Sequence, residues 1–378
     1  MIALEARVLA FRLALLAGLA APFGCSGSGG TTLPASQDDT SSGDAGPGAS
    51  QGPGSSGAGS GSTSGGGSGS TSGATSSGSG GGSGGSSGSG SSGGSSSGGS
   101  SDSGTGASSG SAGKDGGGLW SPTTSAPIHF HWMIGGFSKG DILPNQVGAV
   151  VYDVDGENST AADVAAIHAA GAIAVCYVDV GTLEMDRSDY SQFPSSVVGP
   201  AVAGWPGENW LLVSAANQSV ILPIMKARFQ NWCLAKGFDG IEGDNVDGWT
   251  NISNITQADN LTYDLAIAQL AHALPLSIGL KNLATDLSAS QLPMFVSAFD
   301  WALNEQCYEY SECDAYTKTG SFLPAGKAVF DVEYNTSPDC SQANSAHINA
   351  QLTDLDLVGA TSSGYKYTPC VPDNQATW

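Results

Sequence analysis

Short runs of apolar and β-branched residues recur along the C-terminal part of the chain and predict buried strands. They cover residues 129–134, 148–152, 173–178, 238–243, 276–280, 299–304, 328–332 and 355–360. Segments with apolar positions at helical spacing separate most of them, such as residues 161–170, 220–236 and 256–274. Strands alternating with helices favour a parallel sheet, and eight such strands predict a (β/α)₈ TIM barrel. The first crossover, residues 135–147, is rich in glycine and proline, so we expect an irregular connection there.

The N-terminal part of the chain lacks this pattern. Arg7 and Arg12 precede an apolar run at residues 13–23, which is too short to span a bilayer but fits a signal peptide, so residues 1–25 are predicted to be an export signal. Cys25 then opens a Ser/Gly-rich tract, as in bacterial lipoproteins. Either Cys25 carries a lipid anchor, the only membrane attachment we expect, or ordinary cleavage nearby removes it. Residues 26–119 have almost no large apolar side chain and predict a disordered linker.

Charge supports this division into segments. The chain of 378 residues has a net charge of −22. Residues 1–25 contribute +1 and residues 26–119 contribute −4, which leaves −19 for the predicted barrel domain, residues 120–378. A domain this acidic is not expected to bind nucleic acid, because the phosphate backbone repels it.

Six cysteines lie in the predicted barrel domain, and an even number in an exported protein predicts disulfides. Zinc binding is the alternative use, but the sequence has neither C-x₂-C nor H-x₃₋₅-H spacing, so we expect no metal. One pair is close in sequence and another shares the C-terminal region. The expected disulfides are Cys307 with Cys313, Cys340 with Cys370 and, by elimination, Cys176 with Cys233.

Polar residues follow most of the predicted strands at their C-terminal ends. In a TIM barrel these ends meet at one rim, where active sites are built. Two carboxylates on opposite sides of a glycosidic bond suffice to hydrolyse it, because one protonates the leaving oxygen and the other attacks the sugar or activates water. The sequence has no G-x-S-x-G, P-loop or strand-following G-x-G-x-x-G motif, which argues against acyl transfer and nucleotide chemistry.

Aromatic residues in the domain are available to stack on sugar rings, although each is equally suited to packing. A bound cation is the other reading of clustered carboxylates. The segment from Asp153 to Val164 lacks the glycine and the final glutamate of a calcium loop, whereas a cation shared by Asp244 and Asp247 stays open. The aromatic candidates are Trp132, Trp205, Trp210, Trp249, Tyr152 and Tyr308.

Seven ordered motifs make the domain similar to a known family. They are VYDVDG at 151–156, VCYVDVGTLE at 175–184, GWPGENW at 204–210, GFDGIEGDNVDG at 237–248, GLKN at 279–282, NEQCYEY at 304–310 and VEY at 332–334. Together they resemble the endo-α-1,4-polygalactosaminidases of glycoside hydrolase family 114, which are TIM barrels. The resemblance implies an enzyme that cleaves within an α-1,4-linked, galactosamine-rich exopolysaccharide. Together with the predicted export signal, we expect an exported monomer that needs no cofactor and acts on a cationic glycan.

The resemblance also implies residue roles. The catalytic carboxylates would be Asp244 and Glu305, with Asp247 as an alternative to Asp244. Lys281 ends a buried strand and needs a carboxylate partner, and Arg187 with Glu184 is alternatively a structural ion pair. The candidate substrate-binding residues are Tyr152, Asp153, Asp155, Tyr177, Glu184, Arg187, Trp205, Lys281, Asn282, Tyr308 and Glu333.

Two other functions stay open at this point. A carbohydrate-binding barrel that has lost turnover would bind glycans without releasing reducing ends. A barrel hydrolase of a different polysaccharide would act on other glycans only. The acidic domain favours a cationic substrate, but exported bacterial proteins are often acidic for unrelated reasons.

Overall fold

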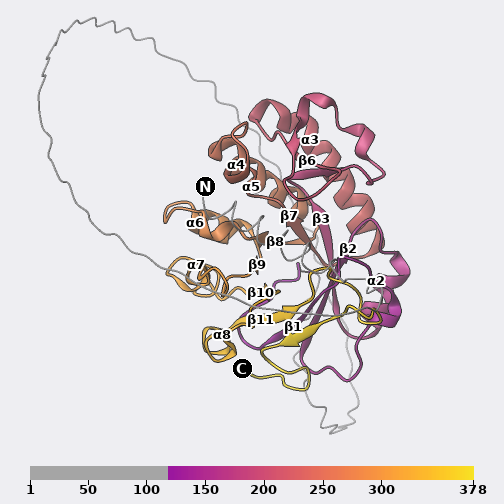
Figure 1. Ribbon diagram of the computed structural model, residues 1–378, viewed down its shortest axis with the longest axis vertical. Helices are drawn as coiled ribbons and strands as arrows, with labels where there is room; N and C mark the ends of the chain where they lie inside the picture. The colour runs from indigo at the N-terminus through magenta and orange to yellow at the C-terminus, as the bar shows by residue number, and fades with distance from the viewer. Residues whose placement is uncertain (1–117) are drawn as a thin grey trace, which may run out of the picture. The chain divides into compact units, whose positions relative to one another are not determined.

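The computed structural model describes residues 118–378, and these form a mixed α/β domain. The predicted signal peptide, Cys25 and nearly all of the predicted linker lie outside the described residues. Eight parallel strands form a curved, nearly closed, barrel-like sheet in the order β1-β2-β3-β7-β8-β9-β10-β11, with the antiparallel β12 added beside β11 (Figure 1). The strands are β1 Ile128–Trp132, β2 Ala149–Asp155, β3 Ile173–Asp179, β7 Gly240–Asp244, β8 Ser277–Lys281, β9 Trp301–Glu305, β10 Val329–Glu333, β11 Ile348–Thr353 and β12 Tyr367–Pro369.

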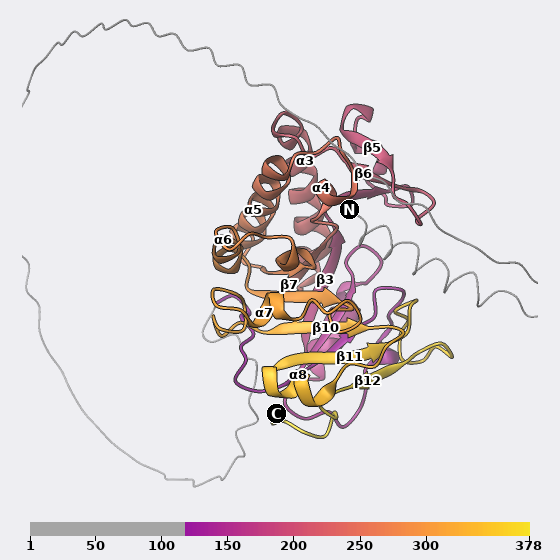
Figure 2. The same ribbon diagram turned by 60° about the vertical axis from the view of Figure 1, so that its left-hand side comes forward.

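Helices lie outside this sheet, with α3, α5 and α6 beside β3, β7 and β8 (Figures 1 and 2). The three predicted helical segments are confirmed, although the second is an α-helix that passes into a π-helical turn, Phe229–Cys233. The crossover predicted to be irregular contains only a short 3-10 helix, Lys139–Asp141. The helices are α2 Ala161–Ala169, α3 Ala215–Arg228, α4 Gly248–Asn251, α5 Gln257–Ala273, α6 Leu292–Ala298, α7 Asp314–Thr317 and α8 Cys340–Ala346.

The prediction of the eighth strand is wrong. Residues 355–360 form a loop, and the eighth parallel strand is β11, which precedes them. The sequence of β11 alternates apolar residues with Asn349, Gln351 and Thr353, and all three polar side chains are buried. A search for apolar runs therefore passes over it and selects the more hydrophobic loop. That loop packs over the sheet, where the Leu357 carbonyl accepts a hydrogen bond from Gly135 N at 3.0 Å.

A second, three-stranded sheet, which the sequence did not predict, follows β3. Its strands are β4 Thr182–Glu184, β5 Val198–Ala201 and β6 Glu208–Leu211, in the antiparallel order β4-β6-β5. Only two residues, Val180 and Gly181, separate the end of β3 from the start of β4, so this small sheet continues from the C-terminal end of the barrel-like sheet.

Two apolar layers make the core, one inside the curved sheet and one between the sheet and the helices. Inside, the Phe130 and Phe330 rings stack at 4.5 Å, and the Trp301 ring meets Phe330 edge-on at 5.7 Å. A side chain at Gly279 would fall 2.4 Å from the Trp301 ring, so only glycine leaves room for this indole. The inner layer fills the lower part of the barrel and supports the polar upper end.

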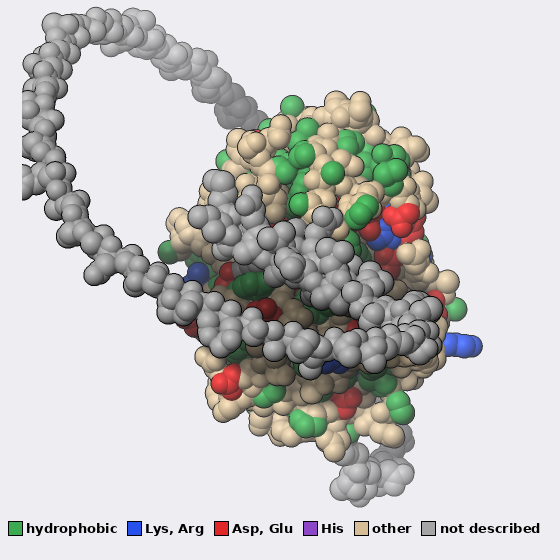
Figure 3. All heavy atoms as spheres, in the orientation of Figure 1, with side chains coloured by type: hydrophobic (Ala, Val, Ile, Leu, Met, Phe, Trp, Pro, Cys, Tyr) green, Lys and Arg blue, Asp and Glu red, His purple; other side chains and the backbone are tan. Residues whose placement is uncertain are grey.

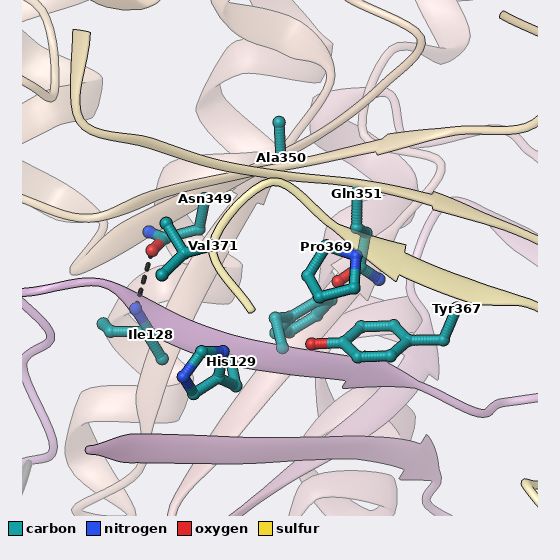
Figure 4. Close-up of a pocket in the computed structure, with 9 residues that line it drawn as sticks. Ile128, His129, Asn349, Ala350, Gln351, Tyr367, Pro369 and Val371 are labelled. Carbon is teal, nitrogen blue, oxygen red and sulfur yellow. Dashed lines mark hydrogen bonds between the residues drawn. The ribbon is translucent and has the colours of Figure 1, made fainter. Parts of the chain in front are cut away.

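The sheet is incompletely closed at a seam between β1 and β11. The Ile128 amide donates to Asn349 Oδ1 at 2.7 Å across this seam, in place of a strand ladder (Figure 4). A cavity of about 10 Å³ remains between β1 and the β11–β12 pair. It is the size of one water molecule and lies away from the polar end of the barrel.

All three predicted disulfides are present: Cys176–Cys233, Cys307–Cys313 and Cys340–Cys370. The first ties β3 to the end of the segment that follows α3, and the last ties α8 to the region after β12. None of the helices among residues 118–378 combines the length and the apolar character needed to cross a bilayer.

Candidate active site

Three neighbouring strands end in charged side chains that point into the barrel. Asp244 is the last residue of β7, Lys281 of β8 and Glu305 of β9. In each case the next residue adopts the left-handed conformation, which ends the strand abruptly. These residues are Asn245 at φ 58°, Asn282 at φ 51° and Gln306 at φ 65°. Such backbone is uncommon for residues other than glycine, and it clusters at functional sites.

Lys281 joins the carboxylates. Its Nζ lies 3.0 Å from Asp244 Oδ1, 3.2 Å from Glu305 Oε2 and 3.0 Å from Glu242 Oε1. It also lies 4.6 Å from the centre of the Trp132 ring. Only 2% of the Lys281 side chain is exposed, yet the surrounding negative charges raise its pKa well above the ordinary value despite burial. One permanent ammonium group therefore holds three acids in place.

Glu242 and Asp153 lie one layer below the two rim carboxylates. Glu242 Oε2 accepts a hydrogen bond from Trp132 Nε1 at 2.7 Å, and burial raises the Glu242 pKa to about 6. Asp153 is fully buried, and burial next to Glu242 raises its pKa well above the ordinary value. An isolated buried carboxylate is costly, so Asp153 is held as a neutral acid that shares its proton with Glu242.

The groups among residues 118–378 that hydrogen-bond to the Asp244 carboxylate are all donors. Besides Lys281, the Tyr177 hydroxyl donates to Oδ2 at 3.1 Å and the Asn245 amide donates to Oδ1 at 2.8 Å. Burial and the Asp244 charge raise the pKa of Tyr177 well above its usual value, so this hydroxyl keeps its proton. These donors fix the orientation of Asp244.

Glu305 is held from both sides. The Asn282 side chain donates to Glu305 Oε2 at 3.2 Å and accepts from the Glu305 amide at 2.8 Å. The Tyr334 hydroxyl donates a short hydrogen bond to Glu305 Oε1, and burial beside this acid raises the pKa of Tyr334 well above the usual value. About a quarter of the side chain, 26%, stays exposed to the cleft, so Glu305 is both oriented and reachable.

Asp247 lies beyond Asp244, at the start of α4, and makes no ion pair among the described residues with Lys281. Burial, followed by the charge of Asp244, raises its pKa to about 6. Asp244, rather than Asp247, therefore shares a cation with Glu305.

The side chains of Asp244, Lys281 and Glu305 form the floor of an open cleft of about 1220 Å³. Arg187 lies on one wall and donates to Glu184 at 2.5 and 2.9 Å and to Asp155 at 2.7 Å, so the predicted Arg187–Glu184 pair is a real ion pair. Acidic side chains are also visible at several places on the face drawn in Figure 3. The aromatic lining consists of Trp132, Tyr177, Trp205, Trp210, Trp249, Tyr310 and Tyr334.

This arrangement can perform acid–base and nucleophilic chemistry on a sugar linkage. Two oriented carboxylates meet at the floor of a cleft that is open to a long ligand. Residues 115–372 match glycoside-hydrolase family GH114. The chain belongs to this family. It is therefore a glycoside hydrolase.

Two solved structures are similar to this chain to different degrees. Ega3 of Aspergillus fumigatus, crystallised in complex with galactosamine, is 30% identical over 68% of this chain and 100% of its own, with a TM-score of 0.53. The glycoside hydrolase domain of PelA from Pseudomonas aeruginosa is 13% identical over 61% of this chain and 95% of its own, with a TM-score of 0.43. No protein with a curated description is detectably similar in sequence.

Most of the predicted site residues of this glycoside hydrolase line the cleft, but four do not. Asp153 lies below its floor, and Tyr308 is partly buried against the hydrophobic core. Tyr152 and Glu333 point out of the barrel, because alternate strand residues face opposite sides. The Tyr152 hydroxyl accepts from the Leu143 amide, and Glu333 accepts from two backbone amides of the loop after β9. The predicted residues that line the cleft are Asp155, Tyr177, Glu184, Arg187, Trp205, Asp244, Asp247, Lys281, Asn282 and Glu305.

The prediction missed three residues of the site. Glu242 was recoverable, because it precedes Asp244 by two positions and so shares its inward face. Tyr334 directly follows β10 and needed only the same alternation. Glu208 lies on the unpredicted small sheet, so no strand pattern pointed to it. Within residues 118–378 no group of three or more His, Cys, Asp or Glu side chains is arranged to hold a metal ion.

Proposed function

We propose that this enzyme hydrolyses α-1,4-linked, galactosamine-rich polysaccharide, with Asp244 and Glu305 as its catalytic pair. One observation carries the proposal: both carboxylates contact the same buried ammonium, at 3.0 and 3.2 Å, on the floor of the cleft. Membership of family GH114 and the likeness to Ega3, whose crystal holds galactosamine, support the choice of sugar.

In the proposed reaction Asp244 is the nucleophile and Glu305 is the acid and base. Glu305 in its acid form protonates the glycosidic oxygen while Asp244 attacks the anomeric carbon, so the leaving sugar departs and a glycosyl ester forms. Glu305, now a carboxylate, takes a proton from the water that attacks this carbon. The ester bond breaks and both side chains return to their first state. Lys281 contacts both side chains and so offsets the negative charge that develops on either of them during the reaction.

The distance between the two carboxylates favours retention of the anomeric configuration. One oxygen of each lies within 3.2 Å of Lys281 Nζ, so these two oxygens are no more than about 6 Å apart. Retaining enzymes have separations of about 5–5.5 Å, whereas inverting enzymes need about 6.5–9.5 Å to admit a water molecule. We therefore expect the α-anomer as the first product of an α-linked substrate.

The charge of the cleft supports a cationic polymer. Its lining includes eight acidic side chains, whereas its two basic groups, Arg187 and Lys281, already pair with acids. Amino sugars without acetyl groups carry ammonium groups, which such a cleft attracts at low ionic strength. The acidic lining comprises Asp155, Glu184, Glu208, Asp244, Asp247, Asp286, Glu305 and Asp356.

We also propose that the enzyme is exported and acts as a monomer. The three disulfides support export, because such bonds persist in oxidising compartments. The predicted signal at residues 1–25 agrees with them, and Cys25 is the proposed point of lipid attachment.

The test is hydrolysis of partly deacetylated α-1,4-galactosaminan by the full chain, measured as new reducing ends. Glu305→Gln should lower turnover by at least about a thousandfold while the melting temperature stays within a few degrees, because the acid and base are lost and the amide keeps the shape. Glu309→Gln, an acid four residues later that does not line the cleft, is the matched control and should keep its activity.

Other outcomes would overturn parts of the proposal. Full turnover by a folded Glu305→Gln variant would remove Glu305 from the mechanism. Comparing Asp244→Asn with Asp247→Asn decides between the two aspartates, and an inactive Asp247→Asn beside an active Asp244→Asn would reverse our choice. Binding without reducing ends would identify a carbohydrate-binding barrel, and activity only on other glycans would identify another substrate.

A further inference from the structure

Glu208 lines the active-site cleft, and no basic side chain among the described residues pairs with it. It lies on β6, directly opposite Glu184 on β4, so the two side chains share one face of the small sheet. Like charges at opposite positions destabilise a sheet. Glu184 is balanced by Arg187, whose Nε, Nη1 and Nη2 groups are all engaged with Glu184 and Asp155. Among residues 118–378, no Lys, Arg or His forms an ion pair with Glu208.

The hydrogen bonds around Thr182 indicate whether Glu208 is protonated. The single hydroxyl of Thr182 lies within hydrogen-bond distance of both Asp179 Oδ2 and, at 2.6 Å, Glu208 Oε1. A hydroxyl has one proton to donate, so one of the two acids must bring its own. Asp179 already accepts from the amides of Gly181 and Thr182 and from the Asn245 side chain. Asp179 is thus supplied with donors as a carboxylate, and Glu208 carries the proton.

The surroundings of Glu208 favour this neutral form. The neighbouring acids that disfavour its ionised form are Asp179 at the end of β3, Glu184 on β4 and Asp244 on β7. Burial, followed by the charge of Asp179, raises the Glu208 pKa to about 8. Burial also raises the pKa of Asp179, but its hydrogen bonds from Thr182 and Asn245 act in the opposite direction. An incoming cation would reverse the balance at Glu208, because it would offset the three neighbouring charges.

We propose that Glu208 is a specificity-determining residue that receives the ammonium group of an unacetylated amino sugar, and that it gives up its proton to solvent as this sugar binds. The proposal rests on the proposed function and adds to it a means of telling an amine from an acetamide. An acetylated sugar has no charge with which to offset the ionised acid, so it meets Glu208 in the neutral form and releases no proton.

The position of Glu208 suits this role. The turn that precedes β6 is closed by a hydrogen bond from the Glu208 amide to the Trp205 carbonyl at 3.2 Å, and the Trp205 side chain lines the same cleft with 52% of its surface exposed. An aromatic face beside a carboxylate offers an apolar surface for the sugar ring and an acceptor for its amine. Glu208 and Trp205 therefore offer both contacts within the cleft.

The experiment measures protons released on binding. The full chain carrying Glu305→Gln, which stops turnover, is titrated at pH 6 with an α-1,4-galactosamine oligosaccharide by calorimetry in phosphate and in Bis-Tris, two buffers with different enthalpies of protonation. At this pH the sugar amines are protonated. Released protons are taken up by the buffer, so the observed heats differ between the buffers by an amount proportional to their number. We expect close to one proton per oligosaccharide bound, and none with the fully acetylated oligosaccharide.

Two further variants in the Glu305→Gln background isolate Glu208. Glu208→Gln imitates the neutral acid and keeps a donor for Thr182, so the melting temperature should be unchanged, the affinity for the amine should fall at least about tenfold, and the proton release should vanish. Asp186→Asn removes one exposed charge from the loop after β4, does not line the cleft, and should change none of these three quantities.

The possible failures are distinguishable. If the wild-type chain hydrolyses galactosaminan but the amine binds without proton release, or Glu208→Gln releases as many protons as its parent, the role of Glu208 is wrong and the proposed function stands. If the wild-type chain neither binds nor cleaves the amine polymer, both proposals are overturned.

Discussion

Removing the Lys281 ammonium tests the centre of the site most directly. The substitution Lys281→Met keeps most of the side-chain volume and deletes the charge that contacts Glu242, Asp244 and Glu305 at 3.0–3.2 Å. The two rim acids can turn toward water. Glu242 cannot, because it is 1% exposed, and among residues 118–378 it keeps neutral partners, such as Trp132 Nε1 at 2.7 Å, but no second cation. The variant therefore leaves a buried carboxylate without its counter-ion.

The size of the effect follows from this burial. Breaking a buried ion pair by removing one partner costs about 3–5 kcal/mol of unfolding free energy, out of a total of about 5–15 kcal/mol for a typical domain. Adding Glu242→Gln should return about 2 kcal/mol, because the amide can still accept from Trp132 and carries no charge. The loss should also shrink toward pH 5, where Glu242, whose pKa is already raised by burial, takes up a proton.

Urea unfolding of the full chain, followed by tryptophan fluorescence, measures these free energies at pH 7 and pH 5. Lys318→Met is the control, because Lys318 is exposed and ends α7. Turnover should fall at least about a hundredfold in Lys281→Met, since the two catalytic acids lose the group that sets their spacing. A coupling free energy below about 0.5 kcal/mol between positions 242 and 281 would refute the argument.

Two further predictions concern the stability of the whole domain. The free energy of unfolding should decline as pH rises from about 4.5 to 8. Burial raises the folded-state pKa of Glu242 to about 6 and that of Glu208 to about 8, so the folded chain holds more protons than the unfolded one in this range. Glu242 alone contributes about 2 kcal/mol, and urea midpoints that rise with pH would contradict the prediction. Replacing both cysteines of the Cys176–Cys233 disulfide, which are 57 residues apart, by alanine should lower the free energy of unfolding by about 4 kcal/mol. The same change at Cys307–Cys313, six residues apart, should lower it by about 2 kcal/mol, because the shorter loop restricts the unfolded chain less. Equal losses in thermal or urea unfolding would argue against loop entropy as the cause.

The sequence predicted the seven apolar strands of the parallel sheet but not the polar strand β11. Seven parallel strands are apolar enough to appear as runs, but β11 fills its buried positions with Asn349 and Gln351. The Asn349 side chain is used at the seam, where it accepts from Ile128 and donates to the Val329 carbonyl. Such pairing depends on a partner from the far end of the chain, and hydrophobicity along one segment does not record it.

The candidate site was predicted in part for a similar reason. The position of a residue at the end of a strand was enough to select Asp244, Lys281 and Glu305. The end of a strand does not by itself tell which way a side chain points. The prediction therefore included Tyr152, which points outward, beside Asp153, which points inward. It lacked Glu242, although Glu242 shares the inward face of Asp244. Glu208 belongs to a small sheet whose strands have only three or four residues, too few to show a period.

The left-handed residues after β7, β8 and β9 separate the charged site residues at the strand ends from the loops that follow them. Each fixes the charged residue before it through the backbone, and Asn245 and Asn282 add side-chain bonds to Asp179 and Glu305. Whatever loop follows begins from the same anchored point. Loops on this rim can therefore lengthen, shorten or change composition over generations, and so alter which polymer is gripped, while the pair of acids that cuts it stays as it was.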